Sequence, residues 1–330
     1  MLRKSLLCAA LMLVGCESED KKPQDVESFR QGVPSKQMVE VSSPGPMGEE
    51  QGKTSAYYGE GELSGNYFLT ATAAFSMNSA TLSVLGLVAE IVKHPPSSIE
   101  GDIAVWGPHA DPLDPISWRL TVQHKEGDTY SWVLDAKGRN APDASFKTVL
   151  SGSHTAGVDG DGERLSGYGS GQFLVDFDNE RGLPGNEEDV QPLATLEVRY
   201  ARTGPDATAS VEADLEYTDE QDLVTNTKYR FKQAPGAGGE LDFVSQQDID
   251  ADPTRAQLER LAIKSRWERN GAGRSDIKLS GGDLFGEATV NECWDQGHMS
   301  TYYAASFNPV LGYGAVSACG SFSTAVYSSL

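Results

Sequence analysis

Apolar and polar side chains alternate with a period of two over most of the chain beyond residue 57. This pattern is typical of β-strands that bury one face and expose the other. In residues 207–217 every odd position is Ala, Val, Leu or Tyr, and every even position is polar or charged. Residues 116–123 alternate in the same way, and the turn at 126–128 leads to a second alternation of large apolar residues in 130–134. The two segments and their turn predict a hairpin.

The alternating segments are numerous enough to indicate the fold class. Further strands are predicted near residues 66–75, 101–107, 145–152, 172–178, 193–201, 226–233, 239–246, 260–267, 275–280, 287–294, 299–307 and 315–323. Gly-rich or Asp-rich turns separate them. Because flat sheets of a dozen or more strands are rare, we expect a mostly β fold. Its large antiparallel sheet is predicted to be strongly curved, as a half-barrel, a barrel or a sandwich.

Residues 79–93 break this pattern and predict one buried apolar helix, because their apolar residues leave only a narrow polar stripe at helical spacing. Asn78 suits the N-cap, and Pro95-Pro96 ends the helix. Such a helix either packs on the sheet as ordinary core or lids a cavity for an acyl chain or another apolar ligand. The second arrangement resembles bacterial lipoprotein and lipid carriers in its general pattern. It would place four residues against the ligand: Leu82, Leu85, Val88 and Ile91.

The first residues have the pattern of an export signal. Arg3 and Lys4 precede an apolar run over residues 6–14, which is too short to span a bilayer. The run ends in Leu13-Val14-Gly15-Cys16, which resembles the lipobox of bacterial lipoproteins. This resemblance implies that residues 1–15 are a signal peptide and that Cys16 carries lipid, including an acyl chain such as palmitate. Glu17, in place of Asp, implies an outer-membrane lipoprotein of the cell envelope.

The segment that follows Cys16 is polar and shows no persistent hydrophobic period. We therefore expect residues 16–56 to be the lipidated Cys and a flexible tether. Some forty flexible residues would allow the folded part to lie about 35 Å from the bilayer. Residues 57–330 are expected to form a single β-rich domain.

The charge of the chain limits its partners. Lys and Arg number 27 and Asp and Glu number 48, so the net charge is -21. A protein that binds a phosphate backbone needs a surplus of cations, and this chain has a deficit, so no nucleic-acid partner is expected. The same charge argues against electrostatic adhesion to anionic lipid. The membrane is expected as a partner through the lipid on Cys16, and the sequence indicates no particular protein or lipid ligand.

Two cysteines near the C-terminus predict a disulfide. An exported protein enters an oxidising compartment, where Cys293 and Cys319 most simply pair. The two cysteines are 26 positions apart. Closing a loop of this length stabilises the folded chain by about 3–3.5 kcal/mol in the chain-entropy model. The alternative is two buried free thiols.

The sequence lacks recognised catalytic motifs, which favours a protein without a catalytic centre. It contains neither Gly-x-Ser-x-Gly nor His-Glu-x-x-His, and no two of its five histidines stand at metal-ligand spacing. A catalytic group assembled from distant residues stays open as an alternative. We therefore expect no cofactor, with the exception of calcium.

Acidic residues at alternate positions make a Ca²⁺ site one interpretation, because calcium prefers six to eight oxygen ligands. The candidate ligands are Asp159, Asp161, Asp176, Asp178, Asp248 and Asp250. The other interpretation is structural, because Asp-Gly pairs are common hairpin turns. The first cluster also lacks the spacing of an EF-hand loop.

Several segments of the folded part resemble uncharacterised predicted lipoproteins of bacteria, among them residues 98–108, 266–276 and 291–295. This resemblance implies no activity. We therefore expect a lipid-anchored cell-envelope protein of binding or structural type. The alternatives are a carrier of an apolar ligand and a hydrolase without a recognised motif.

Overall fold

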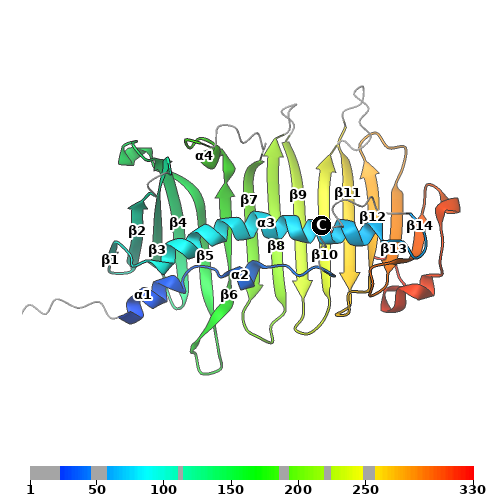
Figure 1. Ribbon diagram of the computed structural model, residues 1–330, viewed down its shortest axis with the longest axis horizontal. Coiled ribbons are helices and arrows are strands. Elements are labelled where there is room, and N and C mark those ends of the chain that lie inside the picture. Colours follow the sequence, from blue (N-terminus) through cyan, green and yellow to red (C-terminus); the bar gives the residue numbers. More distant parts are fainter. Residues whose placement is uncertain (1–22, 46–57, 111–113, 186–192, 219–223, 248–256) are drawn as a thin grey trace, which may run out of the picture.

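The computed structural model describes residues 23–45, 58–110, 114–185, 193–218, 224–247 and 257–330. The fourteen strands of these residues form one antiparallel sheet in which each strand pairs with its neighbours along the chain (Figure 1). The strands are β1 Ser98–Glu100, β2 Ile103–His109, β3 Ile116–His124, β4 Thr129–Gly138, β5 Lys147–Val158, β6 Arg164–Asp176, β7 Leu193–Arg202, β8 Ala209–Thr218, β9 Val224–Gln233, β10 Gly239–Gln247, β11 Glu259–Trp267, β12 Gly273–Gly281, β13 Ala288–Trp294 and β14 Ser300–Ala305.

The mostly β fold and its antiparallel sheet are confirmed. The predicted hairpin is β3 and β4, in which Leu120 lies opposite Leu134. A closed barrel and a two-sheet sandwich are wrong for the described strands, because β1 and β14 stand at opposite ends of one open layer. Each connection joins neighbouring strands, so β1 pairs with β2 alone among the described strands and not with β14. Strong curvature of the sheet stays a prediction.

Two segments predicted as strands are helical. Residues 66–75 belong to the long helix α3, Gly65–Lys93, and residues 315–323 overlap the 3-10 helix η4, Val316–Phe322. The edge strand β1 was not predicted, because its three residues are too few to show an alternation. The other helices are α1 Pro23–Arg30, α2 Lys36–Val39, α4 Phe177–Arg181, η2 Asp143–Ser145 and η3 Pro309–Leu311.

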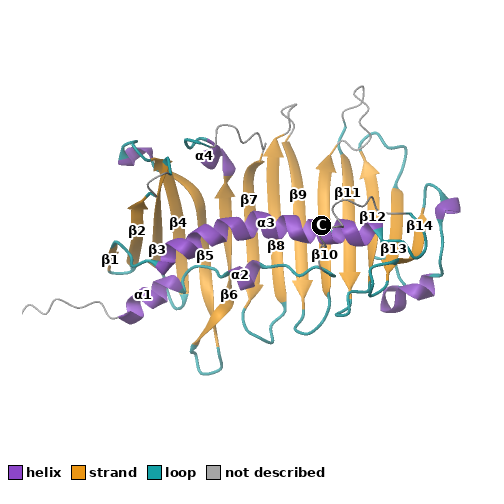
Figure 2. Cartoon of the chain, in the orientation of Figure 1, coloured by secondary structure: helices purple, strands orange, loops and turns teal. Residues whose placement is uncertain are grey.

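Helix α3 crosses the strands on one side of the sheet (Figure 2). Its 29 residues give a length of about 44 Å. It begins fourteen residues before the expected start, because Ser64 caps it by accepting a hydrogen bond from the backbone N–H of Tyr67 at 3.1 Å. It ends at Lys93, before Pro95, as expected. Among the described helices, none combines the length and the apolar character needed to cross a membrane.

The core lies between α3 and the sheet. Alternate residues of β4, from Tyr130 to Ala136, are almost fully buried, which follows from the side-chain alternation of a strand. Trp132 and Phe173 are each 1% exposed, and from α3 Leu85 and Val88 reach the same core, also at 1%. The helix is therefore packed on the sheet as core.

Residues 29–45, which we call the strap, begin at the end of α1, include α2 and run along the sheet beside α3 (Figure 1). The expectation of a flexible tether over residues 16–56 is wrong for residues 23–45, because several strap side chains are buried. These are Phe29, Val33, Met38, Val39 and Val41. Asn78 of α3 fastens the strap by two hydrogen bonds of 2.8 Å to the backbone of Val41. The remaining residues of the expected tether lie outside the described part.

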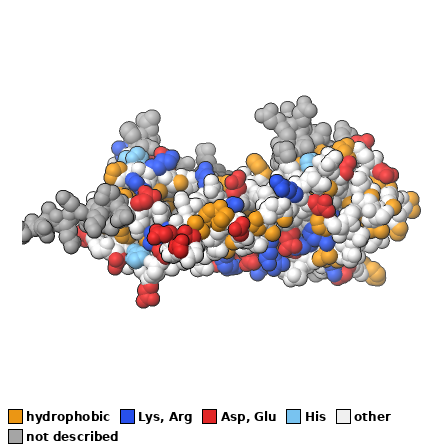
Figure 3. Space-filling view, turned by 90° about the horizontal axis from the view of Figure 1, so that it is seen from below, with side chains coloured by type: hydrophobic (Ala, Val, Ile, Leu, Met, Phe, Trp, Pro, Cys, Tyr) orange, Lys and Arg blue, Asp and Glu red, His pale blue; other side chains and the backbone are white. Residues whose placement is uncertain are grey.

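The opposite face of the sheet carries charged pairs between neighbouring strands. Asp214 of β8 contacts Arg199 of β7 at 2.5 Å, and Asp242 of β10 contacts Lys264 of β11 at 2.8 Å. Opposite charges on adjacent strands stabilise the pairing locally. In Figure 3, which looks at the molecule from below, acidic and basic side chains are interspersed, and basic ones gather along one rim.

The C-terminal residues cover this opposite face at β11–β13. Arg266 donates to the carbonyl oxygen of Thr324 at 2.9 Å, and Arg274 donates to that of Phe322 at 3.1 Å. Cys293 of β13 and Cys319 of η4 form the predicted disulfide, with an S–S distance of 2.04 Å. The disulfide and these hydrogen bonds hold the C-terminal segment on the sheet.

Candidate functional site

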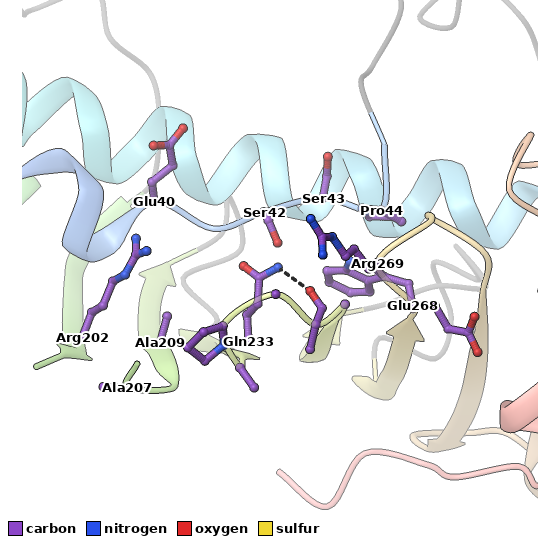
Figure 4. A pocket seen from close by; sticks show the side chains of 16 residues that line it. Glu40, Ser42, Ser43, Pro44, Arg202, Ala207, Ala209, Gln233, Glu268 and Arg269 are labelled. Carbon is purple, nitrogen blue, oxygen red and sulfur yellow. Dashed lines mark hydrogen bonds between the residues drawn. The ribbon is translucent and has the colours of Figure 1, made fainter. Parts of the chain in front are cut away.

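The candidate site is a cavity of about 330 Å³ between the strap and three turns of the sheet, which we call the strap–turn pocket (Figure 4). The strap contributes residues 40–44. The ends of β7 and β11 and the turn between β9 and β10 complete the walls. Its polar lining side chains include Glu40, Ser42, Ser43, Arg202, Gln233 and Arg269. A cavity of this size lies within the range of small-molecule sites.

The turn between β9 and β10 makes one wall, and its backbone geometry requires glycine. Gly236 has a positive φ of 69°. A Cβ on Gly238 would lie 1.7 Å from the carbonyl oxygen of Trp267, so only glycine allows this close packing. Gln233 donates from Nε2 to the carbonyl oxygen of Ala237 at 3.3 Å, which braces the turn (Figure 4). The wall is therefore held in place by local contacts.

Charged groups of both signs surround the pocket. Figure 4 shows Ser42 and Gln233 between Arg202 on one side and Arg269 on the other. Arg202 donates to the carbonyl oxygen of Gln37 at 3.3 Å, which ties β7 to the strap. Glu268 accepts a hydrogen bond from the hydroxyl of Ser321 at 2.6 Å. Because two arginines and two glutamates line the cavity, its formal charges balance.

One hydroxyl of the pocket is available to a ligand. The Oγ atom of Ser42 is buried and has no hydrogen-bond partner among the described residues. Leaving such a group without a partner costs free energy, which a ligand that hydrogen-bonds to it recovers. The lining side chains can bind and orient a polar molecule, and the described lining contains no histidine or cysteine that would act as a base or nucleophile. The arrangement supports binding.

A buried histidine forms a second polar centre that sequence reasoning did not single out. His154 of β5 is 1% exposed, and its Nδ1 lies 2.9 Å from the hydroxyl oxygen of Tyr200. Burial lowers the pKa of His154 to about 4. Burial also raises the pKa of Tyr200. The local signal was weak, because only the pairing of β5, β6 and β7 brings these two residues together.

The described candidates for calcium ligands do not form one site. Asp159 accepts hydrogen bonds from the backbone N–H groups of Asp161 and Glu163 at 2.9 Å, so it shapes the turn before β6. Asp176 caps α4, and Asp178 pairs with Arg181 at 2.9 Å beyond the other end of β6. Among the described residues, no group of three or more acidic, His or Cys side chains is placed to hold a metal ion. The remaining candidates, Asp248 and Asp250, lie outside the described residues.

The candidates for an apolar-ligand site belong to the core. Leu85 and Val88 are buried against the sheet, and Leu82 and Ile91 are half-buried beside them. The strap–turn pocket and three other cavities of the described part are lined by residues outside α3. The structure therefore gives these residues a packing role.

The lipidation candidate Cys16 lies outside the described residues. Comparison with known proteins adds no assignment, because no family model, curated protein or solved structure matches this chain.

Proposed function

We propose that the protein is a lipid-anchored protein of the bacterial cell envelope, held at the outer membrane through Cys16, and that it binds a polar ligand in the strap–turn pocket. The anchor rests on the export signal and on the lipobox residues Leu13-Val14-Gly15-Cys16. Lipid at Cys16 would hold the protein at the membrane firmly if two or more acyl chains are attached.

The packed strap shortens the connection between this anchor and the folded part. Only six residues lie between Cys16 and the start of α1 at Pro23. The seven residue-to-residue steps from Cys16 to Pro23 span at most about 25 Å when fully extended. This reach is less than that of the forty-residue tether expected from the sequence, so the fold is held close to the bilayer.

The single observation that carries the binding proposal is the convergence of polar groups in the strap–turn pocket. The strap, β7, the β9–β10 turn and β11 each contribute such groups. The unpartnered hydroxyl of Ser42 and the balanced charges favour a small polar ligand that is neutral or zwitterionic.

The carrier alternative gains no support from the described residues. It requires a cavity against α3, yet Leu85 and Val88 are each 1% exposed within the packed core. The hydrolase alternative likewise has no specific observation in its favour.

The anchor is tested by the variant Cys16→Ala with labelled palmitate and membrane fractionation. We expect the wild type to take up label and to sediment with membranes, and the variant to do neither. Cys8→Ala is the matched control, because Cys8 lies within the signal peptide and is expected to leave anchoring unchanged. Labelled, membrane-bound Cys16→Ala protein would contradict the anchor.

The pocket is tested by native extraction followed by mass spectrometry of small molecules that co-purify. We expect the wild type to retain a polar molecule that the double variant Ser42→Ala, Arg269→Ala loses. Arg181→Ala, which removes an arginine from α4, is the control that should retain it. Equal recovery from all three proteins, or none from the wild type, would contradict binding in this pocket.

A further inference from the structure

A second cavity lies between the strap and the β5–β6 hairpin, which we call the strap–hairpin cavity. It has a volume of about 190 Å³ and is more enclosed than the strap–turn pocket. One wall is formed by residues 27–38, which belong to α1 and the strap. The other wall is formed by β5 and the first residues of β6. A water molecule takes about 30 Å³ in the liquid, so this volume exceeds that of one or two trapped waters.

Two residues that line this cavity carry buried polar atoms without a well-aligned hydrogen bond to the described residues. They are the Oγ of Ser35 in the strap and the Nε2 of His154 in β5. Buried polar groups are nearly always hydrogen-bonded, so two such atoms at one cavity are unusual. Because they belong to opposite walls, one polar molecule between the walls can accept a hydrogen bond from each.

The protonation state of this centre favours a ligand that accepts hydrogen bonds. Burial lowers the pKa of His154 to about 4, so its imidazole is neutral at pH 7. Burial raises the pKa of Tyr200, so its hydroxyl keeps its proton and can donate to Nδ1 of His154 over 2.9 Å. In that tautomer Nε2 carries the hydrogen and is a donor. The hydroxyl of Ser35 is a second donor.

The charged groups around the cavity are held in ion pairs. Its lining includes two arginines, Arg30 and Arg164, and one carboxylate, Glu27. Arg164 contacts Asp128 through Nε at 2.6 Å, and Arg30 donates through Nε to the carbonyl oxygen of Val92 at 2.8 Å. Arg30 also pairs with Glu27 at 3.6 Å, so both arginines already have carboxylate partners. The free donors are therefore Ser35 and His154, and a carboxylate offers one acceptor oxygen to each of them.

We propose that the strap–hairpin cavity binds a small carboxylate, which accepts hydrogen bonds from Ser35 and His154 and thereby links the strap to the sheet. This site is independent of the strap–turn pocket, because Ser35 and His154 do not line that pocket.

Acetate titrated into the full chain at pH 7 tests the site, with the imidazole of ¹⁵N-labelled His154 as the reporter. We expect a saturable shift of its Nε2 resonance at millimolar acetate. Ser35→Ala removes one donor and should weaken binding about tenfold. Ser76→Ala removes an exposed hydroxyl of α3 that lines neither cavity, and it should bind acetate as the wild type does.

Acetamide serves as the neutral probe of the same size and is expected to shift the resonance far less. Three results would overturn the proposal: no saturable shift with acetate, equal shifts with acetamide and acetate, or unchanged affinity in Ser35→Ala. Ser35→Ala removes only one oxygen atom from the strap, so loss of the fold is not expected. The line shapes of the other histidine resonances show whether the variant is folded.

Discussion

At the scale of single residues, the buried carboxylate of Glu292 has the clearest structural role. It lies on β13 and accepts a hydrogen bond from the backbone N–H of Asn66 at 2.8 Å. It thereby places a carboxyl group at the N-terminus of α3, where the helix dipole favours negative charge. Burial is the largest effect on its pKa, which is raised, while hydrogen bonds from Ser300 and Asn66 oppose that shift. The sequences of β13 and α3, taken separately, do not indicate this contact.

Glu292→Ala should therefore destabilise the protein by about 3 kcal/mol, because it leaves buried N–H donors at the helix start without an acceptor. Urea denaturation measures the change. Glu287→Ala is the control: Glu287 is 60% exposed in its pair with Lys278, so its loss should cost less than about 1 kcal/mol. Similar costs for the two variants would contradict the capping role.

His154 predicts a specific dependence of stability on pH. Its folded pKa of about 4 lies below the ordinary value of 6.5, so the unfolded chain binds the proton more readily. The contribution of neutral His154 to the free energy of unfolding is present in full above pH 6.5 and is lost as pH falls toward 4. It amounts to about 3 kcal/mol.

His154→Gln should flatten the fall in unfolding free energy between pH 6.5 and 4, as measured by urea denaturation at each pH. His124→Gln, at a half-buried histidine at the end of β3, should leave the profile near that of the wild type. A His154→Gln profile that falls as steeply as the wild type would show that this residue does not titrate as predicted.

At the scale of elements, the sequence predicted the strands well and the non-strand segments less well. Period-two alternation identified the β3–β4 hairpin and residues 207–217 because side-chain alternation is local. The same rule failed for residues 66–75, which are helical. Thr70 and Asn66 of this helix form hydrogen bonds with Ser265 and Glu292, which belong to distant strands. The strap was missed because its apolar residues are isolated and show no period. Their burial depends on the sheet and α3.

The strap depends on its hydrogen bonds to α3, and Asn78 makes two of them with the backbone of Val41. Asn78→Ala should release this part of the strap and destabilise the protein by about 1–2 kcal/mol. Hydrogen exchange should rise in residues 29–41 before it rises in the strands. Ser76→Ala, at an exposed position of α3, is the control and should leave exchange unchanged. Uniform exchange in Asn78→Ala and the wild type would contradict fastening by Asn78.

At the scale of the whole molecule, the open sheet is long, and α1 lies near one end of it. Thirteen spacings of about 4.8 Å separate β1 from β14, which gives about 60 Å. Helix α1 lies beside β4, where Phe29 packs edge-on against Tyr130 with ring centroids 6.3 Å apart. If Cys16 carries the lipid, the short link to Pro23 places the β1–β5 end next to the bilayer.

A fluorescent amino acid at position 125, in the β3–β4 turn, should be quenched by nitroxide-labelled lipid more strongly than one at position 306, after β14. The physical reason is the greater distance of β14 from the anchor. In Cys16→Ala protein both labels should escape quenching. Equal quenching at the two positions in the lipidated protein would instead show that the sheet lies flat on the membrane.

The sequence by itself determined the strand-rich class, most strand positions and the cysteine pair, because each depends on neighbouring residues or on spacing along the chain. Only the tertiary structure decided that the sheet is open, that the strap is packed, and that Ser35 meets the cavity of His154. Such features join segments up to 254 residues apart, as Pro44 of the strap and His298 are. Period-two alternation tells which face of a strand is buried, but it does not tell which distant segment covers that face.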